Sequence, residues 1–198
     1  MAVQLASIFF TMILVDNYVL VKFLGICPFL GVSKKLDSAV GMSLAVTFVM
    51  VMATAATWPL YMGILAPNGL EYLQTIVFIL VIAILVQLLE NFLKKFIPAL
   101  YKSLGVYLPL ITTNCTILGV TILNLDNGYS FPESIVCAAG AGIGFLVAMV
   151  LFSGVRRKVE QAIVPECFKG LPITLVAAAM TSLSFMGFGG IVEAIFGV

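Results

Sequence analysis

Long runs of apolar residues follow one another along this chain, separated by short polar stretches. Most runs approach or exceed the roughly 20 residues that an α-helix needs to cross about 30 Å of hydrocarbon. The sequence therefore predicts six membrane-spanning segments, near residues 5–30, 39–63, 72–90, 105–125, 132–155 and 171–195. The breaks between them carry turn and loop residues, at 33–38, 66–69, 91–103, 124–132 and 156–170. Since no soluble domain of any size remains, we expect one membrane domain over residues 1–198.

Composition supports an all-α integral membrane protein. Hydrophobic residues make up 62% of the chain and charged residues 10%, and the mean hydropathy is +1.19. Met1 leads directly into an apolar run without a basic region, so we expect no cleavable signal peptide. Ten basic and nine acidic residues, without a basic stripe, give no reason to expect nucleic acid as a partner. The absence of histidine excludes histidine metal ligands and histidine general bases.

The distribution of basic residues predicts the orientation. Nine of the ten fall after the first, third or fifth segment, at Lys34, Lys35, Lys94, Lys95, Lys102, Arg156, Arg157, Lys158 and Lys169. Basic loops stay in the cytoplasm. We therefore expect both termini, and the loops that hold Glu71, Asp126 and Glu133, to lie outside the cytoplasm.

Two short stretches form an internal repeat with a thiol in each copy. Residues 25–32 and 113–120 share Cys, Leu, Gly and Val at matched positions, 88 residues apart. This offset is close to half of the 198 residues and indicates a duplicated unit, approximately 1–92 and 93–198. Because each unit contains three predicted crossings, the second must run through the membrane in the opposite sense to the first. The sequence predicts two inverted three-helix repeats.

Each cysteine lies among residues that loosen a helix. These are Gly25, Pro28 and Gly31 around Cys27, and Gly105, Pro109, Thr112, Thr113, Asn114 and Gly119 around Cys115. We therefore expect broken or half helices at both motifs, which bring polar backbone to the membrane midplane from opposite sides. Cys27 and Cys115 would then meet near a pseudo-twofold axis.

Two facing thiols admit a disulfide, half of a four-thiolate metal site, or packing alone. A disulfide at mid-membrane would be remote from the oxidising machinery and would make poor use of polar, helix-breaking surroundings. Thiolates without histidine favour iron–sulfur chemistry, and a [2Fe–2S] cluster normally takes four thiolates. A partner subunit with the same inverted fold could supply the missing two. Cys137 and Cys167 lack the repeated context and are interpreted as ordinary or merely reactive thiols.

The stretches 19–35, 104–120 and 180–190 strongly resemble the A-type subunit of the Rnf electron-transport complex, whose sister is the E-type subunit of the sodium-translocating NADH:quinone reductase. This resemblance implies a six-helix subunit that pairs with a homologous, E-type subunit. Each of the two would give two cysteines to a shared [2Fe–2S] cluster, and Cys27 and Cys115 stand at those motif positions here.

The resemblance also implies the function. Complexes of this family lie in the plasma membrane of prokaryotes, pass electrons between ferredoxin and NAD, and couple this to Na⁺ or H⁺ movement. The chain would be one component of such a translocase, working with other Rnf subunits and holding no catalytic residue alone. The coupling ion, the direction of electron flow and the order of carriers stay open.

Other polar residues in the apolar runs have two interpretations. Gly25, Thr113 and Asn114 would surround the cluster or cap a half helix. Asp16, Asn17, Lys22 and Glu90 would line an ion path, or form salt bridges such as Asp16 with Lys22, or lie near a membrane face. The glycines at 140, 142 and 144 predict close helix packing rather than a dinucleotide site.

A second class of function also fits inverted repeats. In a secondary transporter or channel protein, the same broken helices would surround a substrate site, and the cysteines would be incidental. The repeated thiols favour the electron carrier.

Overall fold

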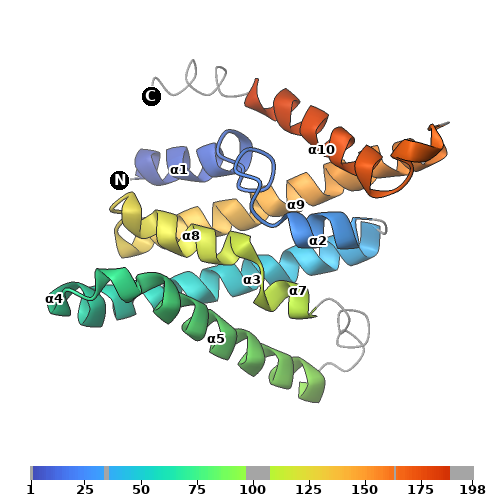
Figure 1. Ribbon diagram of the computed structural model, residues 1–198. Helices are drawn as coiled ribbons and strands as arrows, with labels where there is room; N and C mark the ends of the chain where they lie inside the picture. Colours follow the sequence, from blue (N-terminus) through green and yellow to red (C-terminus); the bar gives the residue numbers. More distant parts are fainter. Residues whose placement is uncertain (1, 34–35, 97–107, 163, 188–198) are drawn as a thin grey trace.

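The structure is a computed structural model that describes residues 2–33, 36–96, 108–162 and 164–187 (Figure 1). Regular structure within these residues is entirely helical, which confirms the predicted class. The α-helices are α1 (Ala2–Leu14), α2 (Ile26–Val32), α3 (Leu36–Leu60), α4 (Ala66–Asn68), α5 (Gln74–Phe96), α7 (Leu108–Thr112), α8 (Cys115–Asp126), α9 (Phe131–Gln161) and α10 (Leu171–Met186). A π-helix, η1 (Tyr61–Leu65), and two 3₁₀-helices, η2 (Glu71–Leu73) and η3 (Glu166–Phe168), complete the elements. Lys34, Lys35, Lys102, Gly105 and both chain ends lie outside the described residues.

Three helical stretches among the described residues are long and apolar enough to cross a membrane: Leu36–Asn68, Glu71–Phe92 and Phe131–Gln161. Three shorter apolar stretches, Leu5–Leu14, Leu110–Asp126 and Leu171–Met186, fall in the other predicted segments. The molecule is therefore built as a multi-pass membrane protein.

One predicted boundary was wrong. The segment over 5–30 is interrupted, as predicted: α1 ends at Leu14 and irregular backbone separates it from α2. The break predicted at 156–170 begins too early, because α9 continues to Gln161 and includes Arg156. The prediction of broken helices at both cysteine motifs is confirmed, since α7 and α8 are also separate.

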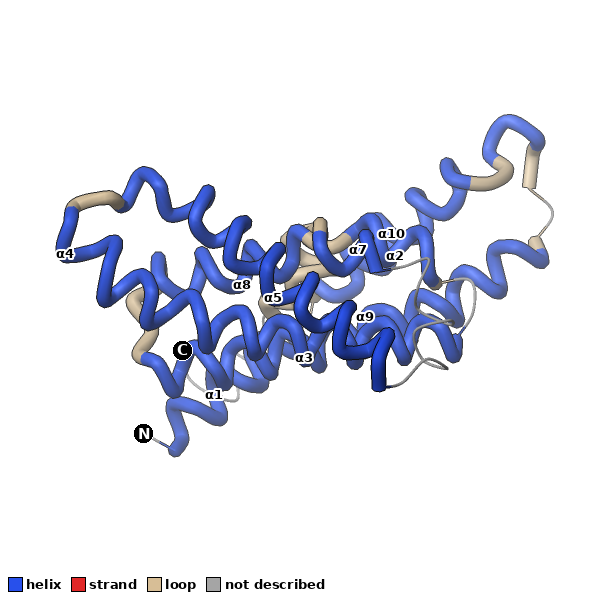
Figure 2. The backbone as a smooth tube through the Cα atoms, turned by 90° about the horizontal axis from the view of Figure 1, so that it is seen from below, coloured by secondary structure: helices blue, strands red, loops and turns tan. Residues whose placement is uncertain are grey.

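The two longest helices, α3 and α9, pack against each other at the centre of the molecule (Figure 1). Helix α1 packs on α9, α8 packs on both central helices, and α5 packs on the outer side of α3. Figure 2 shows irregular backbone in the middle of the molecule as well as at its ends. Loops at mid-length are the expected result of interrupted helices.

The glycines of α9 allow this close packing. A Cβ atom at Gly140 would lie 3.1 Å from the carbonyl oxygen of Phe9, and one at Gly142 would lie 2.4 Å from Cγ2 of Thr47. Gly144 meets the backbone of α1 in the same way. The prediction of close packing at these glycines is confirmed.

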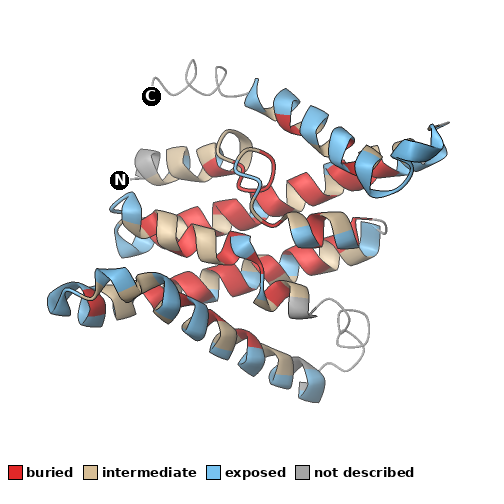
Figure 3. Ribbon diagram, in the orientation of Figure 1, coloured by how far each residue is buried: buried red, intermediate tan, exposed pale blue. Residues whose placement is uncertain are grey.

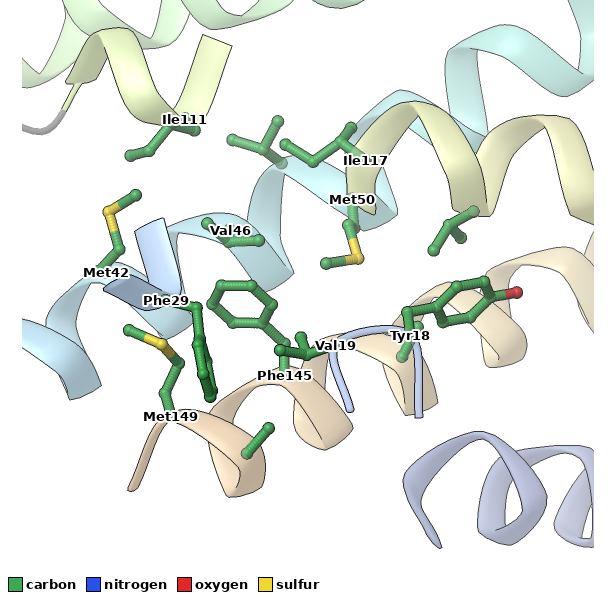
Figure 4. Packing of buried hydrophobic residues seen from close by; sticks show 14 of the residues in the cluster. Tyr18, Val19, Phe29, Met42, Val46, Met50, Ile111, Ile117, Phe145 and Met149 are labelled. Atoms are coloured by element: carbon green, nitrogen blue, oxygen red, sulfur yellow. The ribbon is translucent and has the colours of Figure 1, made fainter. Parts of the chain in front are cut away.

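Buried side chains concentrate on α3, α8 and α9, whereas α5 and α10 are largely exposed (Figure 3). Figure 4 shows Phe145 of α9 among Val19, Val46 and Phe29, so residues before and within α2 take part in the central core. The exposed faces of α5 and α10 are apolar, with Ile76, Ile79, Leu80, Ile84, Leu88, Phe92, Leu175, Val176, Met180 and Leu183. An apolar outer face suits contact with lipid or with a membrane partner.

Candidate functional site

Both repeated cysteines stand in the first turn of a helix that begins in mid-molecule. Cys27 is the second residue of α2, after the N-cap residue Gly25, and Cys115 is the first residue of α8, after the N-cap residue Asn114. Both thiols are free and exposed. The first turn of a helix has backbone N–H groups without intrahelical acceptors, and these groups are free to donate hydrogen bonds to a nearby acceptor.

The two motifs touch directly through Gly25. Its backbone N–H donates a hydrogen bond to Cys115 Sγ over 2.8 Å, although the two residues are 90 positions apart. Gly25 has a φ of 83°, which favours glycine, and a Cβ there would lie 2.2 Å from Thr116 Oγ1. In the second motif, Gly119, which matches Gly31 of the first, is also tightly packed, since its Cβ would lie 2.6 Å from Leu24 Cδ1. Only small residues allow this approach.

Two buried hydrogen-bond donors lie beside Cys115. The Nδ2 atom of Asn114 and the hydroxyl of Thr116 have no partner among the residues that the structure describes. Asn114 is 4% exposed and Thr116 is fully buried. Because a buried donor without an acceptor costs about 1–3 kcal/mol, these groups fit a site that holds sulfur or an anion. Thr113 is exposed at the same break.

Asn114 also starts α8. Its side-chain Oδ1 accepts the backbone N–H of Thr116 over 3.0 Å, which satisfies one free donor of the first turn. Asn114→Ala should therefore lower the unfolding temperature of the solubilised protein by about 2–4 °C, as expected for losing about 1 kcal/mol. Asn127→Ala, at the exposed C-terminal end of α8, is the matched control. An equal effect of both variants would contradict the capping role.

The loop between α1 and α2 contains three of the polar residues predicted near an ion path. Asp16 and Lys22 form an ion pair, with Oδ1 and Nζ 3.8 Å apart, and Lys22 Nζ lies 5.0 Å from the ring centre of Tyr18. The predicted salt bridge is thus present. Asn17 is fully buried and fastens the loop: its amide donates to Gly144 O over 2.8 Å, and its Oδ1 accepts the N–H of Val19 over 3.0 Å.

The remaining candidates lie apart from the cysteine motifs. Glu90 belongs to α5, which lies on the other side of α3 from the α1–α2 loop (Figure 1). Cys137 is fully buried on α9, and Cys167 is exposed in η3 between α9 and α10. The structure therefore brings Asp16, Asn17 and Lys22 into one loop and places Glu90 elsewhere.

Three polar residues near the motifs were missed from the sequence. They are Thr116 beside Gly25, Ser182, whose hydroxyl donates to Leu20 O, and Arg156, whose guanidinium donates to Leu30 O and Ser33. The sequence signal that could have identified them is a polar side chain within or beside an apolar stretch. Arg156 was counted only as a loop charge.

Comparisons with known proteins agree with this architecture. The family described as "Rnf-Nqr subunit, membrane protein" matches residues 5–192. The chain is 54% identical over 180 residues to the A-type subunit of the ion-translocating oxidoreductase complex of Syntrophotalea carbinolica, covering 91% of this chain and 93% of the relative. It is 53% identical over 186 residues to the A-type subunit of the Na(+)-translocating ferredoxin:NAD(+) oxidoreductase complex of Acetobacterium woodii, covering 94% and 97%.

A third relative extends the similarity to another genus. The A-type subunit of the ion-translocating oxidoreductase complex of Aliivibrio salmonicida is 52% identical over 181 residues, covering 91% of this chain and 94% of the relative. The similarity thus includes both broken helices and both cysteine motifs, within one continuous match of the family to this chain. The chain belongs to the Rnf-Nqr family of membrane subunits.

Proposed function

We propose that this chain is a membrane component of an ion-translocating ferredoxin:NAD oxidoreductase complex. In this proposal Cys27 and Cys115 supply two thiolates to a [2Fe–2S] cluster, and a homologous E-type subunit supplies the other two. The relatives named as A-type subunits of such complexes support the assignment to the complex. The contact of Gly25 N–H with Cys115 Sγ carries the site assignment, because it joins the two repeated thiol motifs in one place.

The residues present fit half of such a cluster. Among the described residues, no group of three or more Cys, His, Asp or Glu side chains is placed to hold a metal ion. The described residues therefore offer two exposed thiols at the break, and a four-thiolate cluster would need ligands from a second subunit. The exposure of both thiols leaves them accessible to such a partner.

Within this proposal, the chain holds and tunes the sulfur atoms. The N–H of Gly25 stabilises negative charge on Cys115 Sγ, and the unpartnered donors of Asn114 and Thr116 can stabilise further charge nearby. A bound [2Fe–2S] cluster supplies one-electron transfer within the membrane. Coupling to Na⁺ or H⁺ movement belongs to the assembled complex, together with its ferredoxin and NAD sites.

The same proposal includes two inverted repeats, about 1–92 and 93–198, that make six crossings of a prokaryotic plasma membrane. The directions of the two central helices support it, because α3, in the first half of the chain, begins at the end of the molecule where α9, in the second half, finishes (Figure 1). This end carries Lys94, Lys95 and Lys158 in the last turns of α5 and α9.

Topology can be tested by labelling single cysteines in intact cells with a membrane-impermeant reagent. Residues 34, 95 and 157 should be protected in the cytoplasm, and residues 68 and 127 should react from outside, because nine of ten basic residues lie on one side of the predicted segments. A cytoplasmic C-terminus would contradict the inverted repeats.

A transporter or channel protein without a redox centre is the second candidate. The broken helices at matched positions favour it, together with buried polar atoms without described partners, such as Thr54 Oγ1 and Asn124 Oδ1. Iron analysis and electron paramagnetic resonance (EPR) of the co-expressed complex separate the two. A membrane [2Fe–2S] signal, with little iron in the chain expressed alone, supports the electron carrier. A complex without this signal supports the transporter.

A further inference from the structure

Arg156 is a buried cation whose contacts reach across the molecule to α2. Its residue surface is only 8% exposed, although it lies on α9 between the exposed Gly154 and Arg157. Its Nη1 atom donates to the backbone oxygen of Leu30 and, over 2.8 Å, to Ser33 Oγ. Its Nε atom lies 3.4 Å from Glu160 Oε1. Burying a guanidinium to this extent costs folding free energy unless its N–H groups donate hydrogen bonds, so these contacts stabilise the folded state.

The groups that Arg156 holds are at the C-terminal end of α2. The last carbonyl groups of a helix have no intrahelical donors, and Leu30 O is one of them. Cys27 lies at the opposite end of this seven-residue helix. One turn before Arg156 on the same face of α9, Phe152 stacks on Phe29 of α2, with ring centres 4.0 Å apart.

A helix of seven residues is too short to be stable by itself, so tertiary contacts decide its position. The aromatic stack and contacts with α3 and α7 hold the sides of α2, and the hydrogen bond of Gly25 to Cys115 holds its N-terminal end. Hydrogen bonds from a planar guanidinium to two different acceptors hold the C-terminal end in addition. In a helix this short, a displacement of one end also displaces the other.

We propose that Arg156 is a positioning residue for Cys27: by holding the C-terminal end of α2, it sets where the thiol at the other end lies. The inference rests on the proposed function, because a defined position of Cys27 matters for holding a cluster. The hydrogen bonds of Arg156 to Leu30 O and Ser33 Oγ, called the clamp below, join α9 to the end of α2 whether or not a cluster is bound. Its loss should loosen the backbone of residues 26–33 and change the geometry at Cys27.

The test compares Arg156→Gln with Arg157→Gln in the assembled, purified complex. The control removes the same charge from the neighbouring, exposed residue of the same helix. Hydrogen exchange followed by mass spectrometry reports the opening of α2, and the EPR line shape reports the cluster. Arg156→Gln should raise amide exchange over residues 26–33 by about tenfold, as for a lost charge-assisted hydrogen bond, and should broaden or weaken the EPR signal.

Two milder variants keep the test decisive if Arg156→Gln does not assemble. Arg156→Lys retains charge without the planar fork, and Ser33→Ala removes one acceptor. Both should raise exchange in the same peptide by less than Arg156→Gln, with no change over residues 171–186. Unchanged exchange in residues 26–33, or raised exchange with an unaltered EPR spectrum, would overturn the proposal. If the wild-type complex has no cluster, the proposed function fails, whereas faster exchange confined to the Arg156 and Ser33 variants still supports the clamp.

Discussion

Cys27→Ser or Cys115→Ser should abolish the [2Fe–2S] signal and electron transfer in the assembled complex. In the proposed cluster, each serine would replace one of four thiolates by a poorer ligand, and the described residues offer no nearby histidine or third cysteine as a substitute. EPR and iron content of the purified complex, with ferredoxin-dependent NAD reduction, provide the measurement. Both variants should still assemble, because both thiols are exposed rather than part of the core.

The two other cysteines are the matched controls. Cys137→Ala removes a fully buried thiol from α9, and Cys167→Ala removes an exposed thiol from η3. Both should keep the signal and electron transfer largely intact. If the complex retained its full membrane [2Fe–2S] signal after both Cys27 and Cys115 were replaced, the site assignment would be wrong.

Gly25→Ala should disrupt the contact between the two motifs. The new Cβ would lie 2.2 Å from Thr116 Oγ1 and 3.1 Å from Phe145 Cε2, at a backbone φ of 83° that disfavours alanine. Left-handed strain and overpacking together should cost about 2–5 kcal/mol. We expect less assembled complex, a lower thermal inactivation temperature, and loss of the EPR signal in the fraction that assembles.

Gly128→Ala separates these two causes. Gly128 also has a positive φ, 67°, but a Cβ there meets nothing within 4 Å. This variant should lose only the conformational part, about 1–2 kcal/mol, and should keep the cluster signal. If Gly25→Ala behaved like Gly128→Ala, close approach at Gly25 would not be needed for the site.

The sequence predicted the broken helices because it contains their physical cause. Pro28 and the glycines around Cys27 weaken a continuous helix, and the same kind of residues recur around Cys115. It also predicted the packing role of the α9 glycines, since small residues are what membrane helices need for close approach. The cysteine pair was found by repetition, a signal that does not depend on knowing the fold.

Contacts between distant segments could not be predicted in this way. Nothing local indicates that Arg156 reaches Leu30, because the residue stands in a run of basic residues that is typical of a cytoplasmic loop. Capping of α8 was one of two roles predicted for Asn114, and the structure supports capping. The distance of α5 from the α1–α2 loop is likewise set by tertiary packing.

The contacts that hold the first cysteine motif have a consequence for biogenesis. The partners of residues 17–30 in these contacts come from the second half of the chain: Gly144, Cys115, Arg156 and Ser182. The ribosome makes residues 15–33 long before these partners. The α1–α2 loop therefore lacks these hydrogen-bond partners while the first half of the chain is being inserted. Its shape can be set only after α9 and α10 have entered the membrane. If the chain holds the proposed cluster, insertion of that cluster would therefore follow completion of the chain, and a factor that delivers iron and sulfur would meet a finished protein rather than a nascent one.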